Sequence, residues 1–257
     1  MISFTQRVKS VLRRLLPNSI YPHRIWNGPL RGNRIVTSWH DYPAAILGYT
    51  ERPLLNWFAA NVKPGETWLD IGAQYGYTAI ALCKLVGPAG RVFAFEPMLS
   101  TAGYLSQTRA LNGLSQLSIL PFALGAAADL VSMELPATRG MIDSTLAHGE
   151  WLESIQVANL DWLWSRVCGS DAQIHGIKVD VQGMEIEVLR GMNTILRRWQ
   201  PRLVVELHAG VNRATLLDIL KVSGYSQAAV PVEPLEDETS PRYLDNCSYA
   251  FLPNPSS

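Results

Sequence analysis

Short apolar runs alternate with longer amphipathic runs from residue 61 onward, and the change of period predicts strands and helices in turn. The predicted strands are 67–71, 91–95, 117–120, 176–179, 203–207, 227–232 and 248–252. The predicted helices begin near 77, 99, 161, 184 and 214 and end near 85, 111, 167, 198 and 222. Such alternation is typical of an α/β fold. We therefore expect a Rossmann-like, mostly parallel sheet of seven strands with helices on both faces.

Two segments interrupt this regular pattern. Residues 126–160 contain two β-like runs, 130–135 and 155–160, around a loop with glycine and threonine. Residues 233–242 are rich in proline and acidic residues, which predicts a hairpin loop between the last two strands.

The first 60 residues do not follow the alternation, so we expect a leader before a domain of residues 61–257. The leader is rich in aromatic residues and prolines, and it either covers a bound ligand or forms a hydrophobic seal. Its first predicted helix is too polar to span a bilayer, and its basic residues exclude a secretory signal. This helix packs on the domain, makes a dimer contact or touches an anionic membrane surface weakly. Its apolar face consists of Val8, Val11, Leu12 and Leu15.

Composition narrows the classes of partner. Of the 257 residues, 47% are hydrophobic and 17% are charged, which is typical of a soluble globular domain. The 22 basic residues balance the 22 acidic residues, and this lack of a basic excess disfavours a nucleic-acid partner. Cys83, Cys168 and Cys247 lie far apart, which fits neither a disulfide framework nor a metal site. We expect a cytoplasmic protein that acts on a small molecule, with its oligomeric state left open.

The residues LDIGAQYGYT (69–78) join the first strand of the domain to its first helix. A dinucleotide site requires G-x-G-x-x-G at such a turn, but Gln74 and Tyr77 occupy the places of the second and third glycines. Asp70, at the end of the strand, would repel a diphosphate and attract an ammonium group. S-adenosylmethionine carries an ammonium, a sulfonium and no phosphate, so its charges suit this turn.

Further residues complete the predicted cofactor site. Gly72 and Gly76 allow a close approach of the backbone around Gln74, and the N–H groups at the helix start near Thr78 can bind the methionine carboxylate. Glu96 directly follows the strand RVFAF (91–95) and lies twenty residues beyond Gly76. This is the kind of spacing at which an acid receives ribose hydroxyls.

Together, residues 69–78 and RVFAFEP (91–97) resemble the FkbM-type family of S-adenosylmethionine-dependent methyltransferases. The resemblance covers roughly residues 48–210. It continues through PFALG (121–125), ANLDWLW (158–164), IKVDVQGMEIEVLRGM (177–192) and RLVVELH (202–208). It implies a class I methyltransferase fold, and it places Phe122 and Ala123 of the third motif beside the adenine.

The resemblance also implies the reaction, which is methyl transfer to a hydroxyl of a sugar, glycolipid or polyketide-like product, with S-adenosylhomocysteine released. Two positions depart from the family pattern. Gln74 replaces a usual asparagine and retains the amide, whereas Gln182 replaces a frequent glutamate and removes a charge. If that glutamate acts as a base in relatives, Gln182 keeps only a hydrogen-bonding or positioning role.

An alcohol is a poor nucleophile, so the implied reaction is helped by a base beside the acceptor. Asp180 and His208 follow two predicted strands at the edge where open α/β sheets bind ligands, and they are the predicted catalytic residues. Lys178 and Glu206 lie on the same strands and either join the site or form a supporting network beneath it.

The irregular segment adds a third group of candidates. Asp143, Ser144 and Thr145 match a serine-containing stretch of the family, and they either reach the acceptor or form a turn. We expect His148 to lie in a solvated loop.

Other interpretations of the same residues remain. Asp180, Glu206 and His208 offer oxygen and nitrogen ligands, but their spacing does not demand a metal, and no metal is predicted. N- or C-methylation, or cofactor binding without catalysis, are the alternatives to O-methylation. A nicotinamide-dependent oxidoreductase would need the two missing glycines.

Overall fold

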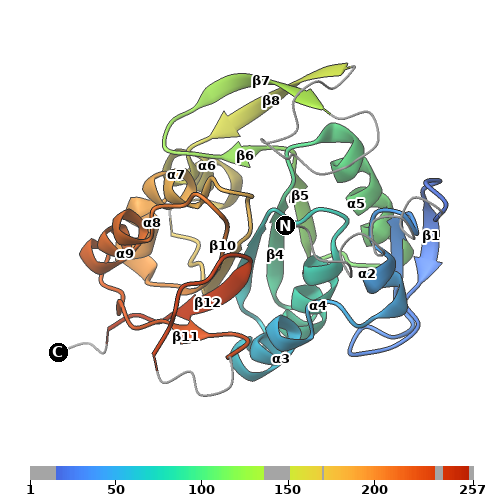
Figure 1. Ribbon diagram of the computed structural model, residues 1–257, viewed down its shortest axis with the longest axis horizontal. Helices are drawn as coiled ribbons and strands as arrows, with labels where there is room; N and C mark the ends of the chain where they lie inside the picture. Colours follow the sequence, from blue (N-terminus) through green and yellow to red (C-terminus); the bar gives the residue numbers. More distant parts are fainter. Residues whose placement is uncertain (1–15, 136–150, 170, 235–239, 255–257) are drawn as a thin grey trace, which may run out of the picture.

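The computed structural model describes residues 16–135, 151–169, 171–234 and 240–254. Its centre is a sheet of seven strands in the order β11-β12-β10-β9-β3-β4-β5 (Figure 1). The strands from β10 to β5 run parallel, whereas β12 and β11 add antiparallel pairs at one edge. The predicted, mostly parallel sheet is therefore confirmed. In chain order the strands are β3 (Thr67–Ile71), β4 (Arg91–Phe95), β5 (Leu117–Leu120), β9 (Gly176–Val179), β10 (Arg202–Leu207), β11 (Val230–Pro231) and β12 (Cys247–Phe251).

Helices cover both faces of this sheet, as predicted (Figure 1). One face carries α3 (Arg52–Asn61), α4 (Tyr77–Val86) and α5 (Leu99–Leu111). The other carries α6 (Leu160–Cys168), α7 (Glu185–Arg190), α8 (Asn193–Trp199) and α9 (Arg213–Val222). Successive residues of a strand point to opposite faces, so Trp68 enters the core under α3–α5 and Leu69 the core under α6–α9.

The described part of the leader packs against the sheet. It contains the antiparallel pair β1 (Tyr21–Arg24) and β2 (Arg34–Thr37), followed by α2 (Pro43–Leu47) and α3. Its side chains Ile35 and Phe58 are buried in the same core as Ile80 of α4. The backbone N–H of Val36 also donates a hydrogen bond to Thr108 Oγ1 of α5, at 3.0 Å. The leader thus completes one of the two cores.

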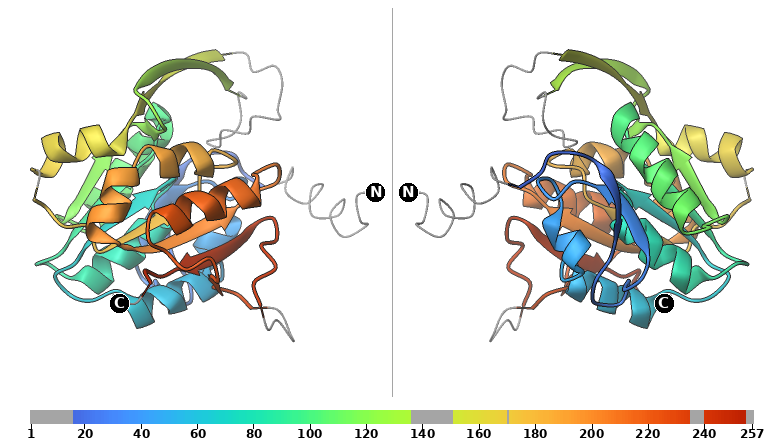
Figure 2. Two further views of the ribbon diagram at one scale, coloured as in Figure 1. Left: turned by 90° about the vertical axis from the view of Figure 1, so that its left-hand side faces the viewer. Right: turned by 90° about the vertical axis from the view of Figure 1, so that its right-hand side faces the viewer.

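A smaller sheet arches away from the body (Figures 1 and 2). It consists of β6 (Ala123–Leu124), β7 (Asp129–Leu135) and β8 (Trp151–Ala158) in the order β6-β8-β7. The β-like runs predicted within residues 126–160 form β7 and β8. The second run ends two residues early, because Asn159 begins α6 by accepting the Trp162 N–H with its side chain.

The predicted helix from 184 to 198 is wrong as a single element, because α7 and α8 are separated at Gly191. A Cβ atom at Gly191 would lie 2.0 Å from the carbonyl oxygen of Gly125, so this part of the chain packs against the smaller sheet. The carboxylate of Asp161 then accepts the N–H groups of Thr194 and Ile195 at 2.8 and 2.9 Å. A side chain from α6 therefore caps α8. The predicted strand 227–232 is also shorter, because only Val230–Pro231 form β11.

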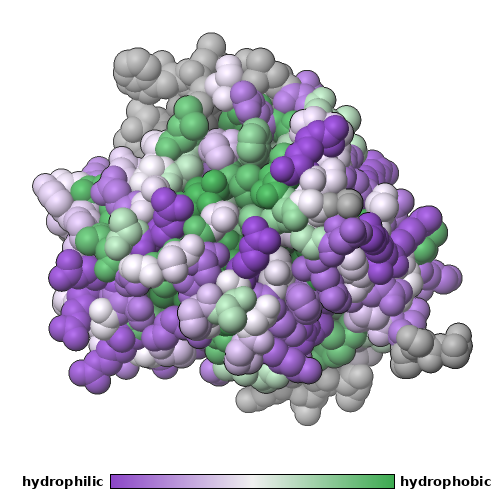
Figure 3. Space-filling model, turned by 180° about the vertical axis from the view of Figure 1, so that it is seen from behind, coloured by the Kyte–Doolittle hydropathy of each residue, from purple (hydrophilic) through white to green (hydrophobic). Residues whose placement is uncertain are grey.

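Two groups of predicted residues lie outside the described residues: the apolar face at Val8, Val11, Leu12 and Leu15, and the loop residues Asp143, Ser144, Thr145 and His148. Among the described helices, none is long and apolar enough to cross a membrane. The face opposite to that of Figure 1 is largely hydrophilic, with apolar residues gathered in its upper middle (Figure 3).

Candidate active site

The sheet has a topological switch point between β3 and β9. From β3 the chain proceeds outward to β4 and β5, and from β9 it proceeds in the other direction to β10. Ligands of open α/β sheets bind at the carboxyl ends of strands at such a point. The residues that follow β3, β4, β9 and β10 are therefore the ones that form the candidate site.

The turn after β3 is held close to the end of β9. Gly72 has φ +81°, and the N–H groups of Gly72 and Ala73 both donate to the Phe95 carbonyl at 3.0 Å. A Cβ atom at Gly72 would lie 1.8 Å from the carbonyl oxygen of Asp180. This contact explains why position 72 is glycine, and it joins the predicted cofactor turn to a predicted catalytic residue.

Gly76 lies at the start of α4. The structure gives a packing reason for glycine at this position, beside the predicted approach to the cofactor. Its φ is +92°, and a Cβ atom there would lie 2.3 Å from Leu105 Cδ1. The glycine therefore permits close packing of α4 on α5. The start of α4 has no side-chain cap. Its first backbone N–H groups thus have no partner from the helix or a capping side chain, and they can receive an anion.

Asp70 lies beneath the turn, where its carboxylate contacts side chains of the protein. Its side chain is fully buried, and Thr78 Oγ1 donates to its Oδ2 at 2.7 Å. Lys178 Nζ lies 3.3 Å from its Oδ1. Lys178 therefore balances the charge of Asp70 within the protein, and the expected attraction between this carboxylate and the ammonium of the ligand stays a prediction. Asp70 and Thr78 shape the turn.

Lys178, on β9, ties the turn to the end of its own strand. Its ammonium donates to the Gly72 carbonyl at 3.0 Å and lies 3.3 Å from Asp180 Oδ2 as well as from Asp70. Burial lowers the pKa of Lys178, but the carboxylates of Asp70, Asp180, Glu51 and Glu206 together raise it above its usual value. Lys178 is therefore a buried cation of the supporting network.

Glu96 orders the other side of the turn. One of its oxygens accepts the Gln74 N–H at 3.0 Å and the other accepts the Met98 N–H at 3.1 Å. Burial raises the pKa of Glu96 to about 7, against the effect of these two hydrogen bonds. A carboxylate has about four acceptor positions, so about two remain for hydroxyl donors. Phe122 and Ala123 follow β5, which neighbours the strand that ends before Glu96.

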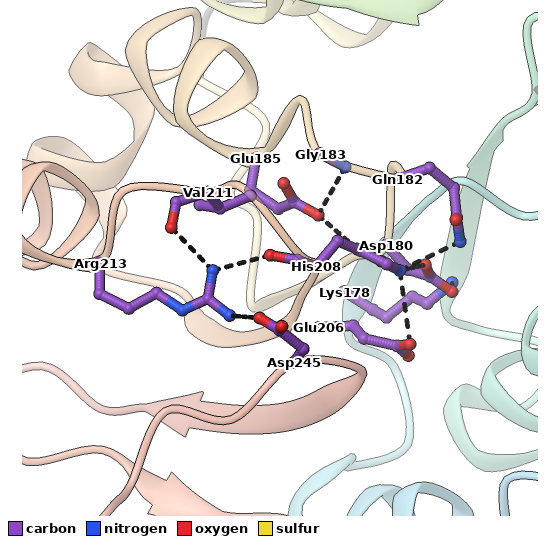
Figure 4. A network of polar contacts seen from close by, with 10 residues as sticks. All are labelled: Lys178, Asp180, Gln182, Gly183, Glu185, Glu206, His208, Val211, Arg213 and Asp245. Atoms are coloured by element: carbon purple, nitrogen blue, oxygen red, sulfur yellow. Dashed lines mark hydrogen bonds and ion pairs between the residues drawn. The ribbon is translucent and has the colours of Figure 1, made fainter. Parts of the chain in front are cut away.

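His208 lies at the centre of the polar network after β10 (Figure 4). Its Nδ1 is 2.6 Å from Glu185 Oε1, and Glu185 is fully buried. Its Nε2 lies 3.0 Å from Gln182 Nε2, 3.6 Å from Asp180 Oδ1 and 3.5 Å from Glu206 Oε1. The fold thus brings both predicted catalytic residues together, with Gln182 beside them.

The contacts of the imidazole define its protonation pattern. With the Gln182 amide donating to Nε2, the ring carries its proton on Nδ1 and donates it to Glu185. Burial lowers the pKa of His208, but Glu185, Asp180 and Glu206 raise it above the usual value. The pKa of Glu206 is itself raised to about 7, mainly by burial and the nearby carboxylate of Asp180.

Two members of this site were not assigned roles from the sequence. Glu185 is the first of two glutamates in the segment 177–192, and its spacing of three and four residues from Val188 and Leu189, on the buried side of α7, was the available signal. Glu51 comes from the leader, and its pKa is raised mainly by burial, with further contributions from Asp180 and Asp70. The leader therefore supplies an acidic group to the site.

S-adenosylmethionine fits the groups at this edge. The start of α4 offers backbone N–H groups suited to the methionine carboxylate, and Glu96 offers free acceptor positions suited to ribose hydroxyls.

Comparisons with known proteins identify the family of the chain. A family model described as the methyltransferase FkbM domain matches residues 70–226. The protein-L-isoaspartate O-methyltransferase of Aeropyrum pernix is 41% identical over 51 residues, which are 20% of this chain and 20% of that protein. The matched segment is thus a fifth of the length of that curated relative.

Two solved structures align with the chain. Fibrillarin of Aeropyrum pernix, in complex with natively bound S-adenosyl-L-methionine, aligns with a TM-score of 0.51 and 14% identity, covering 91% of this chain and 88% of that one. The methyltransferase FkbM of Methylobacillus flagellatus aligns with a TM-score of 0.47 and 18% identity, covering 76% of this chain and 50% of that one. Because the family model spans more than half of the chain, the protein belongs to the FkbM family of S-adenosylmethionine-dependent methyltransferases.

Proposed function

We propose that the protein transfers the methyl group of S-adenosylmethionine to a hydroxyl oxygen of a small molecule, such as a sugar, glycolipid or polyketide-like product. The observation that carries this proposal is the arrangement of His208. Its Nδ1 is fixed by Glu185, and its Nε2 faces Asp180 at the edge of the sheet. The side chains of Asp180 and Glu206 are 27% and 22% exposed, so an acceptor can approach the network from solvent.

The donor side of the site follows from the turn after β3. The N–H groups at the start of α4 near Thr78 would bind the methionine carboxylate, and Glu96 would bind the ribose. Gly72, Gln74 and Gly76 shape the turn that contacts the donor, and Asp70 supports that turn from below. Phe122 and Ala123 would border the adenine.

The chain activates the acceptor and aligns it with the donor. When bound, S-adenosylmethionine supplies a methyl group that is already activated by its sulfonium. His208 Nε2 accepts the hydroxyl proton, the oxygen–carbon bond forms, and the sulfur–carbon bond breaks to leave S-adenosylhomocysteine. Asp180, at 3.6 Å, stabilises the positive charge that the imidazole then carries. Cys83, Cys168 and Cys247 are odd in number and lie far apart along the chain, which supports a reducing compartment, such as the cytoplasm, for this reaction.

Donor binding is tested by calorimetric titration of S-adenosylmethionine against wild type and Glu96→Ala. The matched control is Glu187→Ala, which removes an exposed carboxylate paired with Arg190 on α7. We expect Glu96→Ala to bind at least about tenfold more weakly, because two charge-assisted hydrogen bonds are lost, and Glu187→Ala to bind like wild type. Equal binding by all three proteins would remove Glu96 from the ribose role.

Catalysis is tested by measuring S-adenosylhomocysteine formation with a panel of hydroxylated acceptors. Wild type should release it, and His208→Gln should be slower by about 10²-fold or more. The carbon-13 shift of the transferred methyl group identifies methylation at oxygen, nitrogen or carbon. A product methylated at nitrogen or carbon would refute the O-methylation proposal. Donor binding without turnover on any acceptor would favour a binding protein over an enzyme.

A further inference from the structure

Three side chains at the carboxyl edge of β9 and β10 place ligand atoms around a common point (Figure 4). Asp180, Glu206 and His208 each offer one such atom, and these atoms all lie within 4.8 Å of one another. We propose that they bind one divalent cation, held by two carboxylate oxygens and one imidazole nitrogen. This reverses the expectation from sequence spacing, because residues on two strands approach only in the fold.

The distances suit a metal after small side-chain movements. His208 Nε2 lies 3.6 Å from Asp180 Oδ1 and 3.5 Å from Glu206 Oε1. With bonds of about 2.1 Å in octahedral geometry, adjacent ligand atoms are about 3.0 Å apart and opposite ones about 4.2 Å. The observed separations fall in this range. Both carboxylates are partly exposed, so each is free to adjust by a few tenths of an ångström.

Glu185 gives an independent sign that His208 is built as a ligand. This carboxylate is fully buried, and it binds Nδ1 at 2.6 Å while accepting the Gly183 N–H at 3.1 Å. Metal-bound histidines commonly donate their other ring N–H to a carboxylate, which fixes the tautomer and orients the ring. The result here is that Nε2 lies within 3.6 Å of both carboxylates. The Gln182 amide, 3.0 Å from Nε2, would turn aside when an ion binds.

Asp180 gives a second sign. Its Oδ1 is buried and has no hydrogen-bond donor among the described residues. A buried acceptor without a donor is costly, and a cation would remove that cost. The other carboxylate oxygen faces Lys178, so the two sides of Asp180 have different partners.

The charges around the centre also leave room for a cation. Lys178 pairs with Asp70 and Asp180. The carboxylates of Glu185 and Glu206 both lie beside His208. Arg213, the next cation beside His208, pairs with Asp245 and also donates to three backbone carbonyls. A divalent ion would balance the excess negative charge.

Two carboxylates and one imidazole suit a hard or borderline ion such as Mn²⁺, Mg²⁺ or Fe²⁺. Three protein ligands leave about three of six positions for water. Two neighbouring oxygens of the acceptor can then occupy those positions, and this step rests on the proposed function. In the ion-bound protein Nε2 is a ligand and no longer the base. The ion would lower the pKa of the acceptor hydroxyl, and the hydroxyl proton would leave to water.

The experiment is a titration of chelator-treated full-length protein with Mn²⁺, in which electron paramagnetic resonance measures the free aqua ion. Wild type should bind one equivalent, and Glu206→Gln should bind at least about tenfold more weakly. Glu185→Gln, which removes the charge beside Nδ1 and keeps an acceptor for the Gly183 N–H, should weaken binding by about 10- to 100-fold. Glu187→Gln, on the exposed side of α7, should bind like wild type.

An undiminished free Mn²⁺ signal with wild type at millimolar concentrations would overturn the proposal, and so would equal affinities of wild type and Glu206→Gln. Thermal unfolding and binding of S-adenosylhomocysteine establish that each variant is folded. The titration contains neither methyl donor nor acceptor. Failure of the methyl-transfer proposal therefore leaves this result interpretable, and failure to bind Mn²⁺ leaves methyl transfer through His208 intact.

Discussion

Replacing Lys178 by methionine removes the buried cation that connects the turn after β3 with the end of β9. The ammonium has contacts of 3.0 Å to the Gly72 carbonyl, and of 3.3 Å to Asp70 and to Asp180. Methionine has a similar length and volume, so the change removes charge and hydrogen bonds with little loss of packing. Asp70, which is fully buried, then lacks its counter-ion.

The expected destabilisation is large because one charge of a buried pair remains inside the protein. Such a change costs about 3 to 5 kcal/mol. A domain has about 5 to 15 kcal/mol of unfolding free energy in total, so the variant should be folded but clearly weakened. With a denaturant slope of about 3 kcal/mol per molar urea, the unfolding midpoint should fall by about 1 to 1.7 M.

Urea unfolding followed by circular dichroism measures this shift, with Lys63→Met as the control because Lys63 is exposed. The control midpoint should move by less than about 0.2 M, which corresponds to about 0.5 kcal/mol. Adding Asp70→Asn to Lys178→Met should recover part of the loss, since it removes the stranded charge and keeps an acceptor for Thr78. A midpoint of Lys178→Met within about 0.3 M of wild type, or a double variant less stable than the single one, would refute the reasoning.

Three other predictions concern the same region. Affinity for S-adenosylhomocysteine should rise by up to about tenfold between pH 6 and pH 8, because the pKa of Glu96 is about 7 and only its ionised form accepts two hydroxyl hydrogens. Calorimetry at both pH values measures this change, and Glu96→Gln should abolish it. Gly72→Ala should lower the melting temperature much more than Gly65→Ala. Both glycines have positive φ, but only a side chain at position 72 would clash with a backbone oxygen, that of Asp180. Equal shifts of the melting temperature would contradict this clash. Burial raises the pKa of Cys83 to about 12, so a thiol reagent should modify it only after unfolding, and rapid modification of the native protein would be inconsistent with this environment.

The sheet could be predicted because its information is local. The strand at 176–179 has the same bounds in the structure as in the prediction, since a short apolar run between turns allows few alternatives. The division of the helix after residue 184 could not be predicted in this way. It depends on Gly191 meeting Gly125 and on Asp161 capping α8, and both contacts join residues that are distant along the chain.

The candidate site shows the same limit. Asp180 and His208 could be predicted because each follows a parallel strand, and the fold does bring them together. However, the sequence could not show that Asp70 is neutralised by Lys178, because residues of different strands meet there only through the parallel register of β3 and β9. The pairing of Glu185 with His208 likewise requires α7 to fold back over β10.

The shared core of leader and sheet has a consequence for protein engineering. Residues 70–226, which match the family model, provide only part of the core that contains Ile80, and Ile35 and Phe58 of the leader lie in the same core. A truncated chain starting at residue 61 would leave that core open to water and would tend to aggregate. Chimeras that aim to change the acceptor should therefore exchange the leader together with the domain it covers.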